Sequence, residues 1–132
     1  MLRFIRIFAT TTIALVASAS IATAAPLPDP PAKPNCGSDI ESVFVKGGRS
    51  STSFRVVGTN LWRWLGQDGG GIVHTYVNAP GMSQKHFQSG ASGRGGARSG
   101  LISVTTARQN ISLYVMLNND HNDTLCTKSM GV

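Results

Sequence analysis

The sequence has few of the side chains that enzymes use for acid–base and nucleophilic chemistry. Its 132 residues include a single glutamate, Glu41, and three histidines, and only 14% of its residues are charged. It has no Gly-x-Ser-x-Gly elbow and no phosphate-binding loop that ends in Gly-Lys-Ser/Thr. A serine hydrolase with that elbow and a P-loop nucleotidase are therefore excluded, and the length leaves room for one domain.

The first 24 residues have the pattern of an export signal. Two arginines, Arg3 and Arg6, precede an apolar stretch over residues 7–21. This stretch is followed by Ala22-Thr23-Ala24, the small-x-small pattern that signal peptidase accepts. The stretch is shorter than the roughly 20 residues that a spanning helix needs. We expect residues 1–24 to be removed after Ala24, leaving a secreted or periplasmic protein with no membrane span.

Removal of this segment would lower the charge. Ten Lys and Arg would then stand against six Asp and Glu, so the net charge would fall from +6 to +4. A mild excess of this size favours anionic surfaces without requiring nucleic acid as the partner.

Two cysteines lie near the two ends of the expected mature chain. In an exported protein the simplest expectation for Cys36 and Cys126 is that they pair with each other. Closing a loop of about 90 residues stabilises a fold by on the order of 4 kcal/mol in the chain-entropy model. A reactive or metal-binding thiol is the alternative, but neither cysteine has a Cys-x-x-Cys neighbour and His121 lacks further ligands at zinc spacing. We expect no metal and no cofactor.

The pattern of apolar residues favours a mostly β domain over residues 36–132, preceded by a proline-rich leader at 25–35. Apolar and polar residues alternate with period two in several short runs. Strands are predicted at 39–46, 53–57, 61–65, 72–77 and 111–117, with an edge strand at 125–127. The glycine-rich stretch 81–100 is predicted as a surface loop, and the spacing of Leu101, Val104 and Ala107 predicts a short amphipathic helix over 99–109.

The most distinctive local feature is the segment Leu61-Trp62-Arg63-Trp64-Leu65. On a strand, Trp62 and Trp64 would lie on one face roughly 7 Å apart, which suits stacking on sugar rings or bases. Nearby hydroxyl and amide groups would supply hydrogen bonds to neutral or sialylated sugars. The predicted ligand-binding residues are therefore Trp62, Trp64, Ser50, Ser51, Thr52, Ser53 and Asn60. The alternative is that both indoles pack into the core.

A second arrangement would support chemistry instead of binding. A small basic secreted ribonuclease needs a carboxylate, imidazoles and a cation around a phosphate, and Glu41, His74, His86 and Arg63 contain those groups. Nothing in their spacing singles them out, so no catalytic residue is predicted.

The order of the segments resembles the cell-binding B subunits of bacterial AB5 toxins. The shared features are a signal peptide, Pro34-Asn35-Cys36 before a first strand, several strands, one short helix, a strong strand and a second cysteine. The closest local similarity covers residues 101–115, where the family has a helix that turns into the next strand. The resemblance implies a five- to six-stranded OB-like barrel capped by a helix. It also implies a virulence role as a homopentamer that binds host glycans or glycoproteins beside a separate catalytic chain.

These observations together predict a secreted, non-catalytic binding module that recognises host cell-surface glycans as a toxin-like B subunit. One alternative is a small secreted basic ribonuclease or another enzyme that binds nucleic acid. The other is a secreted inhibitor or envelope protein that binds another protein.

Overall fold

The computed structural model describes residues 33–132, which form one unit of their own. The predicted signal peptide at 1–24 and most of the predicted leader at 25–35 lie outside the described residues. Within the described part of the chain, no helix is both long enough and apolar enough to cross a membrane.

Eight strands form a single antiparallel sheet. They are β2 (Ile40–Gly47), β3 (Thr52–Gly58), β4 (Gly70–Asn78), β5 (Lys85–Ser92), β6 (Gly96–Arg98), β7 (Ile102–Val104), β8 (Ser112–Asn119) and β9 (Thr124–Gly131). Their order in the sheet is β2-β3-β6-β5-β4-β8-β9, and β7 pairs with β3 beside β6. The described residues also contain three short helical turns: η2 (Gly37–Asp39) precedes β2, α1 (Trp62–Leu65) connects β3 to β4, and η3 (Arg108–Asn110) connects β7 to β8. The expectation of a mostly β domain with one short α-helix is confirmed.

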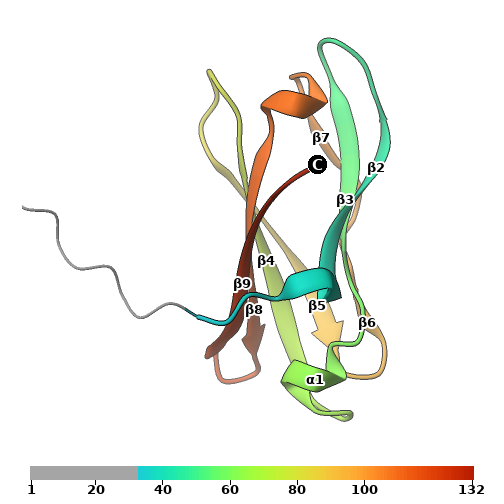
Figure 1. The fold of residues 1–132 in the computed structure, drawn as a ribbon, viewed down its shortest axis with the longest axis vertical. Helices are drawn as coiled ribbons and strands as arrows, with labels where there is room; N and C mark the ends of the chain where they lie inside the picture. The colour runs from blue at the N-terminus through green and yellow to red at the C-terminus, as the bar shows by residue number, and fades with distance from the viewer. Residues whose placement is uncertain (1–32) are drawn as a thin grey trace, which may run out of the picture. The chain divides into compact units, whose positions relative to one another are not determined.

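The sheet curls into a half-barrel, so that its two edge strands approach each other (Figure 1). Side chains join these edges. The hydroxyl of Ser42 in β2 donates to the carbonyl of Gly131 in β9 over 2.8 Å. The ammonium of Lys128 in β9 donates to the carbonyls of Gly37 (2.6 Å) and Ile40 (2.8 Å). The edges are therefore tied at one end without a full ladder between them.

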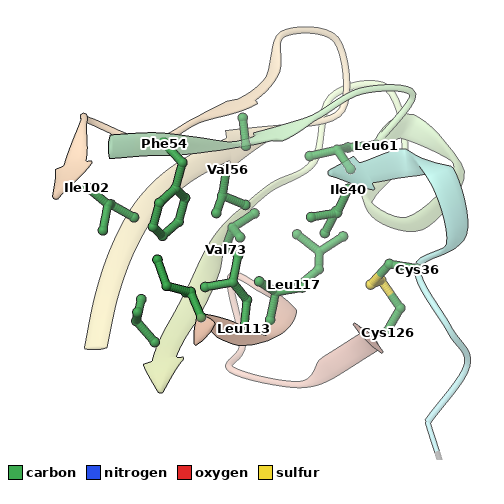
Figure 2. Close-up of a cluster of buried hydrophobic side chains, with 14 of the residues drawn as sticks. Cys36, Ile40, Phe54, Val56, Leu61, Val73, Ile102, Leu113, Leu117 and Cys126 are labelled. Carbon is green, nitrogen blue, oxygen red and sulfur yellow. A yellow bond between two sulfur atoms is a disulfide. The ribbon is translucent and has the colours of Figure 1, made fainter. Parts of the chain in front are cut away.

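The concave face of the sheet holds the core. Alternation on β4 buries Val73, Thr75 and Val77, and alternation on β8 buries Leu113, Val115 and Leu117, as period two predicts. The buried apolar cluster consists of Cys36, Ile40, Phe54, Val56, Leu61, Val73, Val77, Ala97, Ile102, Val104, Ile111, Leu113, Val115, Leu117 and Cys126. Figure 2 shows most of this cluster, with the disulfide at one side of it.

Cys36 and Cys126 form the predicted disulfide, and both are buried. Backbone contacts continue on either side of it. The amide of Cys36 donates to the carbonyl of Thr127 over 3.0 Å, and the amide of Thr127 donates to the carbonyl of Pro34 over 2.9 Å. The start of the domain is thus attached to β9 by one covalent bond and a short stretch of parallel pairing.

Three local predictions are wrong. The segment 61–65 is not a strand, since Trp62–Leu65 form α1 with Leu61 as the N-cap, and this turn places Leu61 and Leu65 on the same side, where both are at least partly buried. The glycine-rich stretch 81–100 is not a loop, since it contributes β5 and β6. The segment 99–109 contains β7 and the start of η3 in place of an amphipathic helix. The sheet consequently has eight strands, not five or six.

Candidate functional site

A surface pocket of about 350 Å³ lies where α1 meets the turn between β5 and β6. Its lining residues are Trp62, Gln67, Gly93 and Arg94. The volume is within the range of small-ligand sites, at its lower end. The pocket is therefore large enough for a small ligand.

Local backbone chemistry places α1 at one wall of this pocket. Asn60 has a positive φ of 55° just before the helix, and Gly66 has a φ of 78° just after it. The amide of Gly66 donates to the carbonyl of Trp62 over 2.9 Å, which closes the single turn. Buried Leu61 anchors this turn to the core, so Trp62 is held at the surface by a short, defined segment.

The opposite wall is the β5–β6 turn, which packs closely on the loop after α1. The amide of Gly93 donates to the carbonyl of Gly69 over 2.9 Å. A Cβ at position 93 would collide with the carbonyl oxygen of Gly66, so only glycine fits this approach. The glycine-rich composition has a structural purpose here, since it lets two backbone segments touch and sets Arg94 beside Trp62.

The two tryptophans do not form the predicted pair of plates. They lie two residues apart on a helical turn, and such residues do not face the same way. Trp62 is 50% exposed and belongs to the pocket. Trp64 packs partly against the core, and its indole N–H donates to a carboxylate oxygen of Asp39 over 3.1 Å. One indole of the predicted pair is therefore available to a ligand at the pocket.

Charged groups surround the exposed indole. The guanidinium carbon of Arg63 lies 5.6 Å from the centre of the Trp62 ring. Arg94 donates from Nε to Asp68 over 3.0 Å, and its Nη2 lies at the limit of a hydrogen bond, 3.5 Å, from the amide oxygen of Gln67. Because both members of the Arg94–Asp68 ion pair are largely exposed, the pair contributes little to stability. Arg94 can therefore exchange Asp68 for a ligand at small cost.

The predicted hydroxyl cluster at 50–53 lies away from this pocket. It belongs to the β2–β3 hairpin, at the opposite end of the domain from α1 in Figure 1. Thr52 and Ser53 are buried, and their hydroxyls bond to the carbonyl of Thr106 and the hydroxyl of Ser103, both over 2.9 Å. Ser50 and Ser51 are exposed in the hairpin turn. The structure thus separates residues 50–53 from Trp62 and leaves Asn60 next to α1.

The convex face of the sheet carries a second group of polar side chains, two of which, His74 and His86, were considered in the ribonuclease alternative. Nδ1 of His74 in β4 lies 2.9 Å from Nε2 of His86 in β5. The two rings are nearly parallel, at 13°, with centroids 5.1 Å apart. We call His74 and His86 the histidine pair. The alternation of residues on β4 could have indicated that His74 points outward. Its partner, His86, lies in the segment that was predicted to be a loop.

Aromatic side chains fix one member of the histidine pair. The ring of Tyr76 stacks on His86 with centroids 4.5 Å apart and an angle of 9°. The ring of Tyr114 lies beside Tyr76 at 6.3 Å and 41°. His86, Tyr76 and Tyr114 are direct neighbours across β5, β4 and β8. Because the His86 and Tyr76 rings stack face to face, their polar edges point away from the stack.

The structure does not assemble the residues considered for a ribonuclease. Glu41 lies on β2, Arg63 on α1 beside Trp62, and the histidine pair on β4 and β5. In the sheet, β3 and β6 separate β2 from β5. The two imidazoles bond directly to each other, so no phosphate fits between them in this arrangement.

The environment of His74 predicts a pH effect on stability. Burial, and then the nearby His86, lower the pKa of His74 from its ordinary value. Its other direct neighbours across the strands are Gln88 and Met116, which carry no charge. The unfolded chain therefore binds this proton more readily than the folded one, so stability is complete above pH 6.5 and falls as the pH drops through the lower folded pKa.

The substitution His74→Gln should make the loss of stability below pH 6.5 less steep than in the unmodified protein. Urea unfolding at pH 7.5 and at pH 5.5 measures this difference through the shift in midpoint. His121→Gln, on the exposed β8–β9 turn, is the matched control and should keep the original pH dependence. Equal pH dependence in His74→Gln and His121→Gln would contradict the prediction.

Comparison with known proteins found no relative of this chain. No family model matches the chain, and no match was found among the curated proteins or the solved structures. Fold and site define a small, disulfide-linked, mostly β domain with one pocket of defined chemistry at its α1 end.

Proposed function

We propose that this protein is an exported, non-catalytic binding module that recognises glycans through the pocket around Trp62. The observation that carries the proposal is the placement of a half-exposed indole beside Arg94 and Gln67 in one small pocket. Indole faces pack against the apolar C–H faces of sugar rings, and amide and guanidinium groups bond to hydroxyl or carboxylate oxygens.

The charges at the pocket favour acidic sugars over neutral ones. Arg63 and Arg94 together outnumber the single carboxylate of Asp68. A sugar carboxylate would take the place of Asp68 on the Arg94 guanidinium and keep a charge-assisted hydrogen bond there. The disulfide is compatible with a secreted or periplasmic location, where such glycans are met.

A glycan array followed by titration tests this proposal. We expect binding of the purified protein to quench or shift the fluorescence of Trp62, with sialylated glycans preferred. Trp62→Ala should weaken binding at least about tenfold, as truncation of an aromatic anchor usually does. Arg94→Gln should weaken binding of the acidic glycans more than that of their neutral counterparts.

Matched variants outside the pocket serve as controls. Leu101→Ala removes another apolar side chain of similar exposure, 47%, and Arg98→Gln removes an exposed arginine from β6. Both should bind like the unmodified protein. Absence of any glycan ligand, or equal loss of binding in the control variants, would overturn the proposal.

A specific observation supports binding of another protein as a second candidate function. The edge strand β2 exposes Val43, Phe44 and Val45, with Val43 and Val45 about 45% exposed. Edge strands with apolar side chains readily accept a further strand from a partner. The toxin-like homopentamer would also need such a contact between copies. The mass in solution tests this candidate, because Val43→Lys together with Val45→Lys should turn any assembly into monomers while leaving glycan binding at Trp62 intact.

A further inference from the structure

Charged side chains are segregated along the long axis of the domain. Figure 1 shows α1 and the β8–β9 turn at one end, and the β2–β3 hairpin, the β4–β5 turn and η3 at the other. Within residues 33–132, every acidic side chain lies towards the α1 end. Asp39 and Glu41 lie around the start of β2, Asp68 follows α1, and Asp120 and Asp123 belong to the β8–β9 turn. The hairpin end of the domain therefore has no acidic side chain.

The hairpin end carries cations instead. Lys46 lies in β2, Arg49 in the turn between β2 and β3, and Lys85 at the start of β5, directly after the β4–β5 turn. All of them are exposed. The single ion pair among residues 33–132 joins Arg94 to Asp68 near α1, so no carboxylate side chain neutralises these cations. We call Lys46, Arg49 and Lys85 the cationic end.

Exposed apolar side chains lie directly beside the cationic end. Val43, Phe44 and Val45 precede Lys46 in β2 and are 45%, 37% and 46% exposed. The register of β2 on β3 shifts between Phe44 and Lys46, so the usual alternation of buried and exposed residues is interrupted. The guanidinium carbon of Arg108 lies 4.2 Å from the centre of the Phe44 ring and helps to hold this ring in place. One surface therefore combines apolar side chains with unneutralised positive charge.

This combination of groups matches the surface of an anionic bilayer. Apolar side chains gain free energy at the boundary between lipid headgroups and acyl chains, while lysine and arginine are attracted to lipid phosphates. Single-stranded nucleic acid would also attract the cations, but it binds through aromatic faces on which its bases stack. Val43 and Val45 offer no such face, and Arg108 lies over the ring of Phe44. The apolar side chains of β2 therefore favour lipid over nucleic acid.

We propose that the hairpin end of this domain docks on an anionic phospholipid surface. Val43, Phe44 and Val45 enter the boundary between headgroups and acyl chains, and the cationic end contacts lipid phosphates. The pocket at Trp62 lies at the α1 end, so it faces away from the bilayer in the docked protein. Docking uses none of the pocket residues and does not depend on the proposed glycan binding.

Sedimentation of the purified protein with large vesicles tests the proposal. We expect the protein to bind vesicles made of equal parts phosphatidylglycerol and phosphatidylcholine, and not vesicles of phosphatidylcholine alone. Binding should weaken as salt is raised, because salt screens exposed charges. Each cation near an anionic surface strengthens binding roughly fivefold. Lys46→Gln/Arg49→Gln should therefore lower the partition coefficient at least about tenfold.

Matched variants at the α1 end are the controls. Arg63→Gln/Arg94→Gln removes the same amount of charge there and should leave vesicle binding close to that of the unmodified protein. Val43→Ser/Val45→Ser should weaken vesicle binding several-fold, whereas Trp62→Ala, which removes a half-exposed apolar side chain beside the pocket, should not. Because all these side chains are at least partly exposed, the variants should fold, and circular dichroism checks this.

Three outcomes would overturn the proposal. Equal loss of vesicle binding in the two charge variants would show attraction by net charge alone. Binding to a single-stranded oligonucleotide without binding to anionic vesicles would assign the cationic end to nucleic acid. A second copy of the chain would cover the same apolar side chains of β2. A change of mass in solution for Val43→Ser/Val45→Ser, with vesicle binding unchanged, would therefore assign them to a contact between copies.

Discussion

Loss of the Cys36–Cys126 disulfide is expected to lower the free energy of unfolding by about 2–5 kcal/mol. The bond spans a sequence separation of 90 residues, so its removal frees nearly the whole domain in the unfolded state. For a domain of this size, each kcal/mol corresponds to about 4–8 °C in melting temperature. Thermal melts of Cys36→Ala/Cys126→Ala should therefore show a transition at least about 8 °C lower. Alanine is the suitable replacement because both sites are buried and apolar.

The same variant supplies the control for chemical reduction. Addition of a reductant should lower the melting temperature of the unmodified protein towards that of the double alanine variant, whose own transition should not move. Local opening should also appear at a defined place, because Cys36 joins the start of β2 to β9 beside the Cys36–Thr127 backbone bond. Hydrogen exchange should therefore speed up in β2 and β9 before it does in β4. If the double alanine variant had the same melting temperature as the unmodified protein, this account would be wrong.

The central strands of the fold could be predicted from the sequence. In β4 and β8, apolar residues alternate with outward residues over most of each strand, and the structure contains both predicted strands, with one face of each buried. The disulfide could be predicted too, because two cysteines in a chain that is expected to be exported leave one simple pairing. Both predictions rest on a simple sequence pattern, the period-two alternation or the single possible cysteine pair, and the contacts within the fold agree with that pattern.

The site was harder to predict because its segments are short and ambiguous. Residues 61–65 fit both a strand of period two and one turn of helix, and the backbone at Asn60 and Gly66 decides in favour of α1. The segment 81–100 looks like a loop by composition, but β5 pairs with β4 along its whole length, from Val77–Lys85 to Gly70–Ser92. Backbone pairing does not need large side chains, so composition gave no signal for it.

The same error concealed how the pocket and the histidine pair are assembled. Arg94 reaches the pocket, and His86 reaches His74, only because residues 85–98 form strands that fold back beside β4 and β3. The tryptophans were identified by residue type alone, and of these Trp62 lies in the pocket while Trp64 supports α1 from inside. Residue chemistry identified Trp62 and both histidines, but only long-range strand pairing brings Arg94 to Trp62 and His86 to His74.

Gly93→Ala is expected to have the second large effect, because it acts on stability and on the pocket together. A methyl group at this position would meet the backbone of Gly66 and Gln67, which cannot move aside by a change of rotamer. The β5–β6 turn must then shift away from the loop after α1 and give up the Gly93–Gly69 hydrogen bond. Overpacking of this kind costs about 1–3 kcal/mol, and more where only backbone can yield.

Gly90→Ala, in β5 just before this turn, provides a matched control, since nothing lies within 4 Å of a Cβ there. Its urea midpoint should stay close to that of the unmodified protein, as is usual for surface changes within about 0.5 kcal/mol. Gly93→Ala should unfold at clearly lower urea and, at concentrations where it remains folded, lose glycan binding at Trp62. Equal urea midpoints for Gly90→Ala and Gly93→Ala would mean that the β5–β6 turn does not pack on the loop after α1. The pocket would then lack its second wall.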